Sequence, residues 1–179
     1  MQLSQLHTNN RLLVALSALL GFNLIIAVIL PFVKLRGIDF SQFVQIQGAF
    51  MTAMLIADPL ISPLADKYGR RAMIIAGSLF WAIGHIAIWI SSNIWSYMAA
   101  EVLLGIGMAA YKPAFKALMY EGFVAANREE EHYDMLTLTN VWQSIAAAVS
   151  SVIGGLMFII SPNVTAALTP LSTFGLVGL

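Results

Sequence analysis

The chain contains apolar runs that are long enough to cross a membrane as helices. A helix needs about 20 mainly apolar residues to span about 30 Å of hydrocarbon. Six runs approach or exceed that length, and they cover residues 12–33, 43–64, 72–90, 94–114, 135–160 and 164–179. Their apolar residues are continuous and do not alternate with polar ones, which favours helices over the strands of a barrel. The sequence therefore predicts an all-α polytopic membrane protein, a bundle of six transmembrane helices.

The composition supports this class and excludes others. Hydrophobic residues make up 59% of the chain and charged residues 10%, whereas soluble domains have about 45–50% and about 25%. So little charge cannot cover an ordinary solvated surface, which argues against a water-soluble enzyme. A formal net charge of +0 gives no field that would attract nucleic acid. The sequence has 0 cysteines and no zinc-binding His-Glu-x-x-His helix, phosphate loop or nucleophile elbow, so no metal, cofactor or catalytic residue is predicted.

The basic residues are unevenly shared between the two sides that six crossings would define. With a cytoplasmic N-terminus, the cytoplasmic segments hold seven of them, namely Arg11, Lys67, Arg70, Arg71, Lys112, Lys116 and Arg128. The opposite side holds two, Lys34 and Arg36. Because Lys and Arg of short loops concentrate in the cytoplasm, both termini are predicted to be cytoplasmic. The run 164–179 is short for a full crossing and has no polar anchor at its far end, so we expect the chain to be cut off before a second half.

Between the second and third runs, residues 62–71 read Ser-Pro-Leu-Ala-Asp-Lys-Tyr-Gly-Arg-Arg. This segment resembles the signature G-x-L-x-D-R/K-x-G-R-R/K of the major facilitator superfamily, with serine in place of the leading glycine. The resemblance implies the N-terminal six-helix half of a transporter whose two halves rock about a central site. It also implies a latch that holds the cytoplasmic gate closed against the other half. The latch residues carried over from the motif are Asp66, Lys67, Gly69, Arg70 and Arg71.

Four polar residues inside the runs are candidates for a proton or substrate site: Glu101, Asp58, Asn23 and Gln143. A charged group at mid-bilayer costs at least about 2.5–3.5 kcal/mol, so Glu101 and Asp58 are functional hypotheses by default. The amides Asn23 and Gln143 are expected either to line a polar cavity or to bond to a neighbouring helix. Glu101 is the leading candidate, as a proton or cation site or as the structural partner of a basic group elsewhere. Asp58 lies near the cytoplasmic interface, where a simple solvated role is favoured. A fifth polar residue, His85, is interpreted as a packing residue.

Two pairs of glycines are predicted to let helices pack closely, since small residues permit close approach in lipid. Gly105 and Gly107 follow Glu101 in a segment similar to the superfamily's fourth-helix motif R-x-x-Q-G-x-G-x-A, where Glu101 replaces the arginine. A role attached to that arginine cannot be transferred to an acid, but a buried carboxylate can itself take up a proton. Gly154 and Gly155 match only the close of the exporter signature G-x-x-x-G-P-x-x-G-G, which permits export by proton exchange without supporting it.

The function expected from these features is secondary active transport of a small solute by alternating access, without ATP. Proton-coupled export of small amphiphilic molecules is the first hypothesis, and uptake of a sugar, amino acid or other metabolite is the second. A six-span oligomeric channel or assembly protein is an alternative from another class. An intramembrane serine protease is disfavoured because no convincing serine–histidine pair is present. The expected partners are the lipid bilayer, a small-molecule substrate and a second six-helix half of the same full-length chain, in a bacterial inner membrane.

Overall fold

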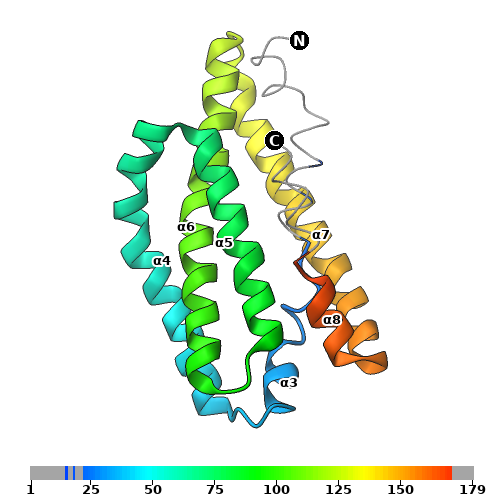
Figure 1. The fold of residues 1–179 in the computed structure, drawn as a ribbon. Helices are drawn as coiled ribbons and strands as arrows, with labels where there is room; N and C mark the ends of the chain where they lie inside the picture. Colours follow the sequence, from blue (N-terminus) through cyan, green and yellow to red (C-terminus); the bar gives the residue numbers. More distant parts are fainter. Residues whose placement is uncertain (1–14, 16–17, 19–21, 171–179) are drawn as a thin grey trace.

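The computed structural model describes residues 15, 18 and 22–170, and its long helices stand side by side (Figure 1). In chain order the elements are α3 (Ile29–Lys34), α4 (Phe40–Tyr68), α5 (Arg70–Ile90), α6 (Ile94–Ala125), a 3₁₀ turn η1 (Glu129–Glu131), α7 (His132–Ile160) and α8 (Pro162–Leu168). The described part of the chain contains no strand. The predicted all-α class is therefore confirmed.

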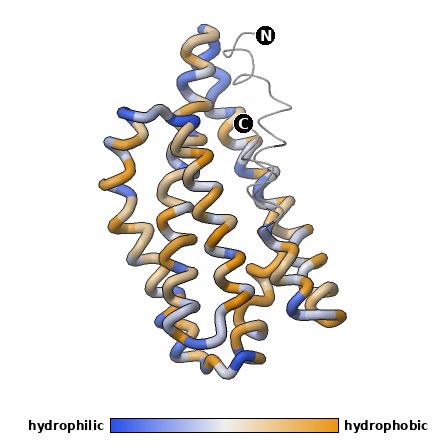
Figure 2. The backbone as a smooth tube through the Cα atoms, in the orientation of Figure 1, coloured by the Kyte–Doolittle hydropathy of each residue, from blue (hydrophilic) through white to orange (hydrophobic). Residues whose placement is uncertain are grey.

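Four stretches are long and apolar enough to cross a membrane. They are Phe40–Tyr68, Arg70–Ile90, Ile94–Ala125 and Glu129–Ile160, the last of which joins η1 to α7. Figure 2 shows hydrophobic residues along these helices, while hydrophilic residues gather at the turns between them. A lipid environment requires this distribution. The backbone N–H and C=O groups form their hydrogen bonds within each helix, and most polar side chains lie at the helix ends.

The first expected span departs from an unbroken helix. Within the range 12–33, residues 22–28 are not helical, with bends and turns from Leu24 onward, and α3 begins only at Ile29. The Asn23 side chain accepts a hydrogen bond from the backbone N–H of Ile25 at 3.2 Å, a local turn that competes with a helix. Pro31 lies in the first turn of α3, where its missing N–H costs no helical bond. The rest of this range lies largely outside the described residues.

The other helix limits also differ from the expected ranges. The helix α6 continues to Ala125, beyond the expected end at residue 114, and it accommodates Pro113 in its interior. The last expected span, 164–179, corresponds in the described part of the chain to α8, which ends at Leu168. Residues 171–179 lie outside that part.

The helix ends carry local signals that fix the turns. Asp39 at the start of α4 and Asn93 at the start of α6 each form a capping box, with Gln42 and Ser96 respectively. The turn between α4 and α5 consists of Gly69 alone, with φ at +88°. A side chain would strain that backbone, so glycine is what allows α5 to reverse directly onto α4.

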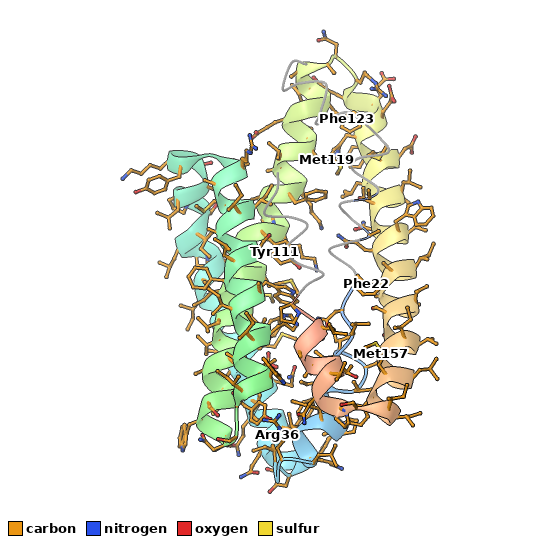
Figure 3. All side chains as sticks on the ribbon, turned by 45° about the vertical axis from the view of Figure 1, so that its right-hand side comes forward. Phe22, Arg36, Tyr111, Met119, Phe123 and Met157 are labelled. Atoms are coloured by element: carbon orange, nitrogen blue, oxygen red, sulfur yellow. The ribbon has the colours of Figure 1, made fainter. Side chains whose placement is uncertain are left out.

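The interior is divided between two apolar clusters. One cluster includes Phe32, Ile46, Tyr97 and Leu104, and it joins α3 to α4 and α6. The other lies between α5, α6 and α7 and contains Ile74, Ala114, Phe115, Met119, Phe123 and Met135. Figure 3 labels Met119 and Phe123 at one end of the bundle and Arg36 at the opposite end.

At the end opposite the Gly69 turn, Arg36 joins three elements. Its Nη1 donates to the backbone oxygen of Ser91 at 2.7 Å, after α5, and its Nη2 donates to Oδ1 of Asn163 at 2.9 Å, in α8. Its guanidinium also lies 4.9 Å from the centre of the Phe32 ring. One side chain thus fixes α3, α5 and α8 at the same place.

Candidate functional site

A cavity of about 240 Å³ lies between the 22–28 segment, α4, α5 and α6. Most of its walls are apolar, and they include Ile25, Ile29, Phe50, Met51, Ile88, Leu104 and Met108. Its polar lining residues are Asn23, Gln47, His85 and Glu101, and Trp81 lies beside them. A concave, mostly apolar site with a few convergent polar groups is the usual form of a small-molecule site.

Glu101 is the charged group of this cavity. It lies two turns into α6, and its exposed fraction is 5%. One carboxylate oxygen, Oε1, accepts a hydrogen bond from Nε2 of Gln47 on α4 at 2.9 Å. No Lys or Arg of the described residues forms an ion pair with it. Its partner is therefore a neutral amide, which leaves the carboxylate free to change its protonation state without breaking a salt bridge.

His85 and Asn23 form a second polar group in the same cavity. The backbone oxygen of Trp81 can only accept, so His85 Nδ1, 2.9 Å away, carries a proton and donates to it. The other ring nitrogen, Nε2, lies 3.1 Å from Nδ2 of Asn23 and accepts from that amide. The hydroxyl of Ser150 on α7 bonds both the N–H and the C=O of Asn23, at 3.1 Å and 3.2 Å. The Trp81 ring packs edge-on against the imidazole at 5.0 Å.

The predicted site residues are only partly brought together. Glu101 and Asn23 line one cavity, whereas Asp58 lines a separate one of about 280 Å³ that it shares with Arg70. Gln143 lies half-buried on α7 and lines neither cavity. The sequence analysis missed Gln47, because an amide in an apolar run carries no motif. It noticed His85 but assigned it to packing, since its contact with Asn23 depends on the tertiary fold.

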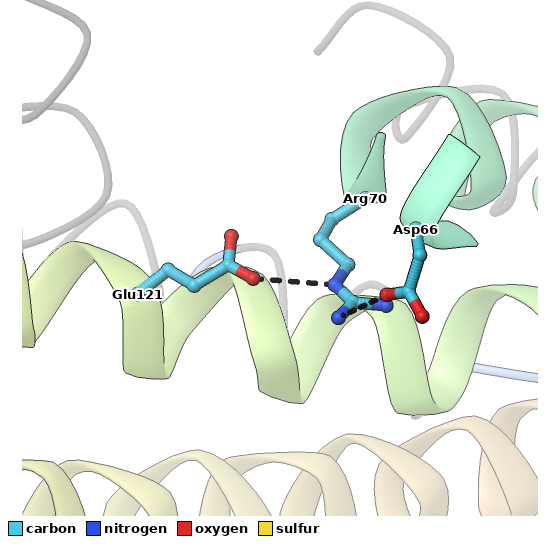
Figure 4. Close-up of polar contacts among 3 residues, drawn as sticks. All are labelled: Asp66, Arg70 and Glu121. Carbon is cyan, nitrogen blue, oxygen red and sulfur yellow. Dashed lines mark hydrogen bonds and ion pairs between the residues drawn. The ribbon is translucent and has the colours of Figure 1, made fainter. Parts of the chain in front are cut away.

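At the other end of the bundle, Arg70 connects three helices (Figure 4). It is the first residue of α5, and its Nη2 lies 2.9 Å from Oδ1 of Asp66 in the last turn of α4. Its Nε lies 3.2 Å from Oε1 of Glu121 on α6. Glu121 was not predicted, because the sequence suggested a loop where α6 continues. Of the remaining motif residues, Lys67 lies over the Tyr68 ring at 5.1 Å.

The four predicted packing glycines have different surroundings. A Cβ added to Gly105 would lie 2.5 Å from the backbone oxygen of Phe50 on α4, and one on Gly107 would lie 2.8 Å from that of Gly77 on α5. A Cβ on Gly154 would overlap the backbone oxygen of Leu24. Gly155 has open space around its Cβ position within the described part of the chain. The first three therefore lie where backbones approach closely.

Comparison with known proteins defines the class to which this helical membrane bundle belongs. The family model of the Major Facilitator Superfamily matches residues 11–179. The chain belongs to that superfamily. With its apolar helices, this makes it an integral, multi-pass membrane protein.

Individual relatives are similar over part of the chain. Multidrug resistance protein 2 of Bacillus subtilis is 29% identical over 100 residues, which cover 56% of this chain and 25% of the relative. The multidrug transporter MdfA of Edwardsiella piscicida is 25% identical over 104 residues, which cover 58% of this chain and 25% of the relative. The vacuolar membrane amino acid uptake transporter fnx2 of Schizosaccharomyces pombe is 25% identical over 122 residues, which cover 66% of this chain and 20% of the relative. The matched part of the chain thus covers between 20% and 25% of the length of these relatives.

Proposed function

We propose that this chain is the N-terminal six-helix half of a secondary transporter that exports small amphiphilic molecules in exchange for protons. The observation that carries the proposal is Glu101, a buried carboxylate in a mostly apolar cavity whose bonded partner is the neutral Gln47. Apolar walls suit the hydrophobic part of an amphiphile, and the carboxylate suits a proton or a cationic group. The multidrug relatives support export as the direction.

In this proposal Glu101 alternates between a proton and the substrate. A carboxylate surrounded by apolar groups is costly when charged, so it takes up a proton when no cationic group is present. Release of the proton restores the charge that attracts the next substrate. Asn23 contributes polar contacts in the same cavity, whereas Asp58 and Gln143 face other surroundings and have secondary roles here.

The Arg70 cluster serves as the latch of the cytoplasmic gate. Arg70 carries charge-assisted bonds to Asp66 on α4 and Glu121 on α6, so these helix ends move together while the bonds last. Lys67 and Arg71 add positive charge at the same membrane surface, and Gly69 permits the tight turn. The second half of the full-length chain would complete the closed gate. A bacterial inner membrane is the proposed location.

The test is proton-driven flux in the full-length protein reconstituted into vesicles. Glu101→Gln keeps the size and the hydrogen-bonding shape of the side chain but cannot ionise, so we expect it to abolish transport driven by a pH gradient. Gln47→Asn is the matched control, because it shortens the neutral partner and leaves the carboxylate in place. Unchanged pH-driven flux in Glu101→Gln would refute the proton-site assignment.

The uptake alternative is supported by one relative named as an amino acid uptake transporter. The same vesicles distinguish uptake from export. An exporter accumulates a lipophilic dye only in inside-out vesicles with a proton gradient. Accumulation of an amino acid or sugar in right-side-out vesicles would favour uptake instead. Gradient-independent, non-saturable flux would favour a six-span oligomeric channel.

A further inference from the structure

In the cavity that Glu101 lines, two side-chain oxygens have no hydrogen-bond partner among the described residues. One is Oε2 of Glu101, whose other oxygen already accepts from Nε2 of Gln47. The second is Oε1 of Gln47, because this amide turns its NH₂ group toward the carboxylate and its oxygen away from it. Each free oxygen shares a carbon atom with one of the two bonded atoms, so both lie beside the 2.9 Å contact between α4 and α6. The cavity therefore presents a pair of neighbouring acceptors, one charged and one neutral.

The other polar side chains of this cavity are already engaged. Nδ2 of Asn23 donates to His85, and Oδ1 of Asn23 accepts from a backbone N–H. The second ring nitrogen of His85 donates to a backbone oxygen, so the ring is fully bonded in its neutral form. Among the described residues that line the cavity, none is a Lys or Arg. No cation of this part of the chain therefore competes for the two acceptors on Glu101 and Gln47.

A ligand that enters the cavity displaces the water that would otherwise bind these two oxygens. An acceptor that is left without a donor in a desolvated place is costly. A protonated amine carries several N–H donors on its charged nitrogen, as the ammonium group of lysine does, so it can donate to both oxygens. A quaternary ammonium ion has the same charge, but its nitrogen carries only carbon atoms and can donate to neither.

We propose that Gln47 makes this site selective for protonated amines over quaternary ammonium ions. The inference rests on the proposed function, in which Glu101 binds the cationic group of the substrate, and it narrows the substrate to amphiphiles whose head group retains N–H bonds. Glu101 attracts both kinds of head group by its charge. Oε1 of Gln47 adds an acceptor that only an amine can satisfy, while the apolar walls accept the hydrocarbon body.

The experiment measures binding to the full-length protein in lipid nanodiscs by isothermal titration calorimetry, at about pH 8, where an alkylamine keeps its proton. The probes are phenethylamine and its N,N-dimethyl and N,N,N-trimethyl derivatives. They share one aromatic body and one positive charge, but they carry progressively fewer N–H donors and finally none. Heats measured with empty nanodiscs are subtracted, so that partition into the lipid is not counted as binding.

We expect phenethylamine to bind at least about tenfold more tightly than the trimethyl derivative, because the latter leaves a buried acceptor unpaired. The dimethyl derivative, which retains one N–H, should lie between them. This order follows from the number of donors and not from the charge, which is the same in all three probes.

Gln47→Leu separates hydrogen bonding from size. Leucine has a similar volume but no acceptor, so the preference for the amine should fall below about threefold, while the trimethyl derivative binds as before. Since Glu101 remains, transport driven by a pH gradient should persist, and only the choice among head groups should change. Should Gln47→Leu fail to fold, Gln47→Met takes its place, because methionine is unbranched and at most a weak acceptor.

Gln45→Leu is the matched control, because it makes the same change on the same helix. Gln45 is exposed and lines neither cavity. This variant should keep the preference of the wild type.

Two results would overturn the selectivity. Equal affinity of the wild type for all three probes would mean that N–H donors are not required. An unchanged preference in Gln47→Leu would mean that the bulk of the methyl groups, and not the amide oxygen, sets the order. If Glu101→Gln weakens all three probes in either case, the cation site of the proposed function stands and only the role of Gln47 is lost. If no probe binds, or if Glu101→Gln changes none of the affinities, the cation site itself is refuted.

Discussion

Gly154 and Gly155 are neighbours on α7 with opposite surroundings. A Cβ on Gly154 would overlap the backbone oxygen of Leu24, while the Cβ position of Gly155 is open within the described part of the chain. We expect Gly154→Ala to force the 22–28 segment away from α7 and to lower stability by about 1–3 kcal/mol, as overpacking does. The melting temperature of the purified full-length protein checks this.

The matched control is Gly155→Ala. Alanine favours helix over glycine by up to about 1 kcal/mol, so this variant should melt at the same temperature or slightly higher. Equal destabilisation by both variants would mean that the contact with Leu24 does not contribute to stability.

At the level of single residues, the sequence predicted the charged member of the cavity but not its neutral partners. A carboxylate in an apolar run is conspicuous, because its cost in lipid is large. Gln47 and His85 are uncharged and carry no such cost once they are hydrogen-bonded. Gln47 bonds to Glu101 and His85 bonds to Asn23, and each pair joins residues far apart in the chain. Only the tertiary fold shows which of several polar residues meet.

Among the helices, the Arg70 cluster offers a direct test of the proposed latch. Arg70→Gln removes the charge that holds the ends of α4 and α6 to α5, so the closed state should lose about 1–3 kcal/mol relative to the open one. A cysteine at Ser62, in a background without other cysteines, would then react with a maleimide at least about fivefold faster. Lys116→Gln serves as the control, because it removes the same charge from an exposed position on α6.

An unchanged labelling rate in Arg70→Gln would contradict the latch. If Lys116→Gln accelerated labelling to the same extent, the effect would come from the total surface charge and not from the bonds to Asp66 and Glu121. Glu121→Gln gives an intermediate case, since it removes the charge of one of the two carboxylates and leaves at most a neutral hydrogen bond there.

The helix class was predictable because each run is long and uniformly apolar. The helix limits were less so. In the range 12–33 the apolar pattern continued across Asn23, but the local bond to Ile25 breaks the helix there. In α6 the pattern ended near residue 114, yet the helix continues to Ala125 because Met119 and Phe123 pack into the cluster with α5 and α7. A local hydrogen bond thus decides the first limit, and tertiary contacts decide the second.

At the scale of the whole molecule, the arrangement in the membrane stays a prediction. The Gly69 turn is expected in the cytoplasm and the Ser91–Asn93 turn outside it, from the distribution of Lys and Arg. In cells, a cysteine at Ser92 should react with a membrane-impermeant maleimide, and one at Tyr68 should react only after permeabilisation. The reverse pattern would invert the predicted topology and place the Arg70 cluster on the outer side.

The length of α6 has a mechanical consequence. Glu101 and Glu121 lie on the same helix, about 30 Å apart along its axis at about 1.5 Å per residue. A tilt of about 6° at the cavity end would displace the far end by about 3 Å over that length, which is close to the 3.2 Å separation between Glu121 and Arg70. A rigid α6 would therefore turn a small adjustment at the cavity into a displacement large enough to separate Glu121 from Arg70, and Pro113, which gives no backbone N–H, lies between the two acids.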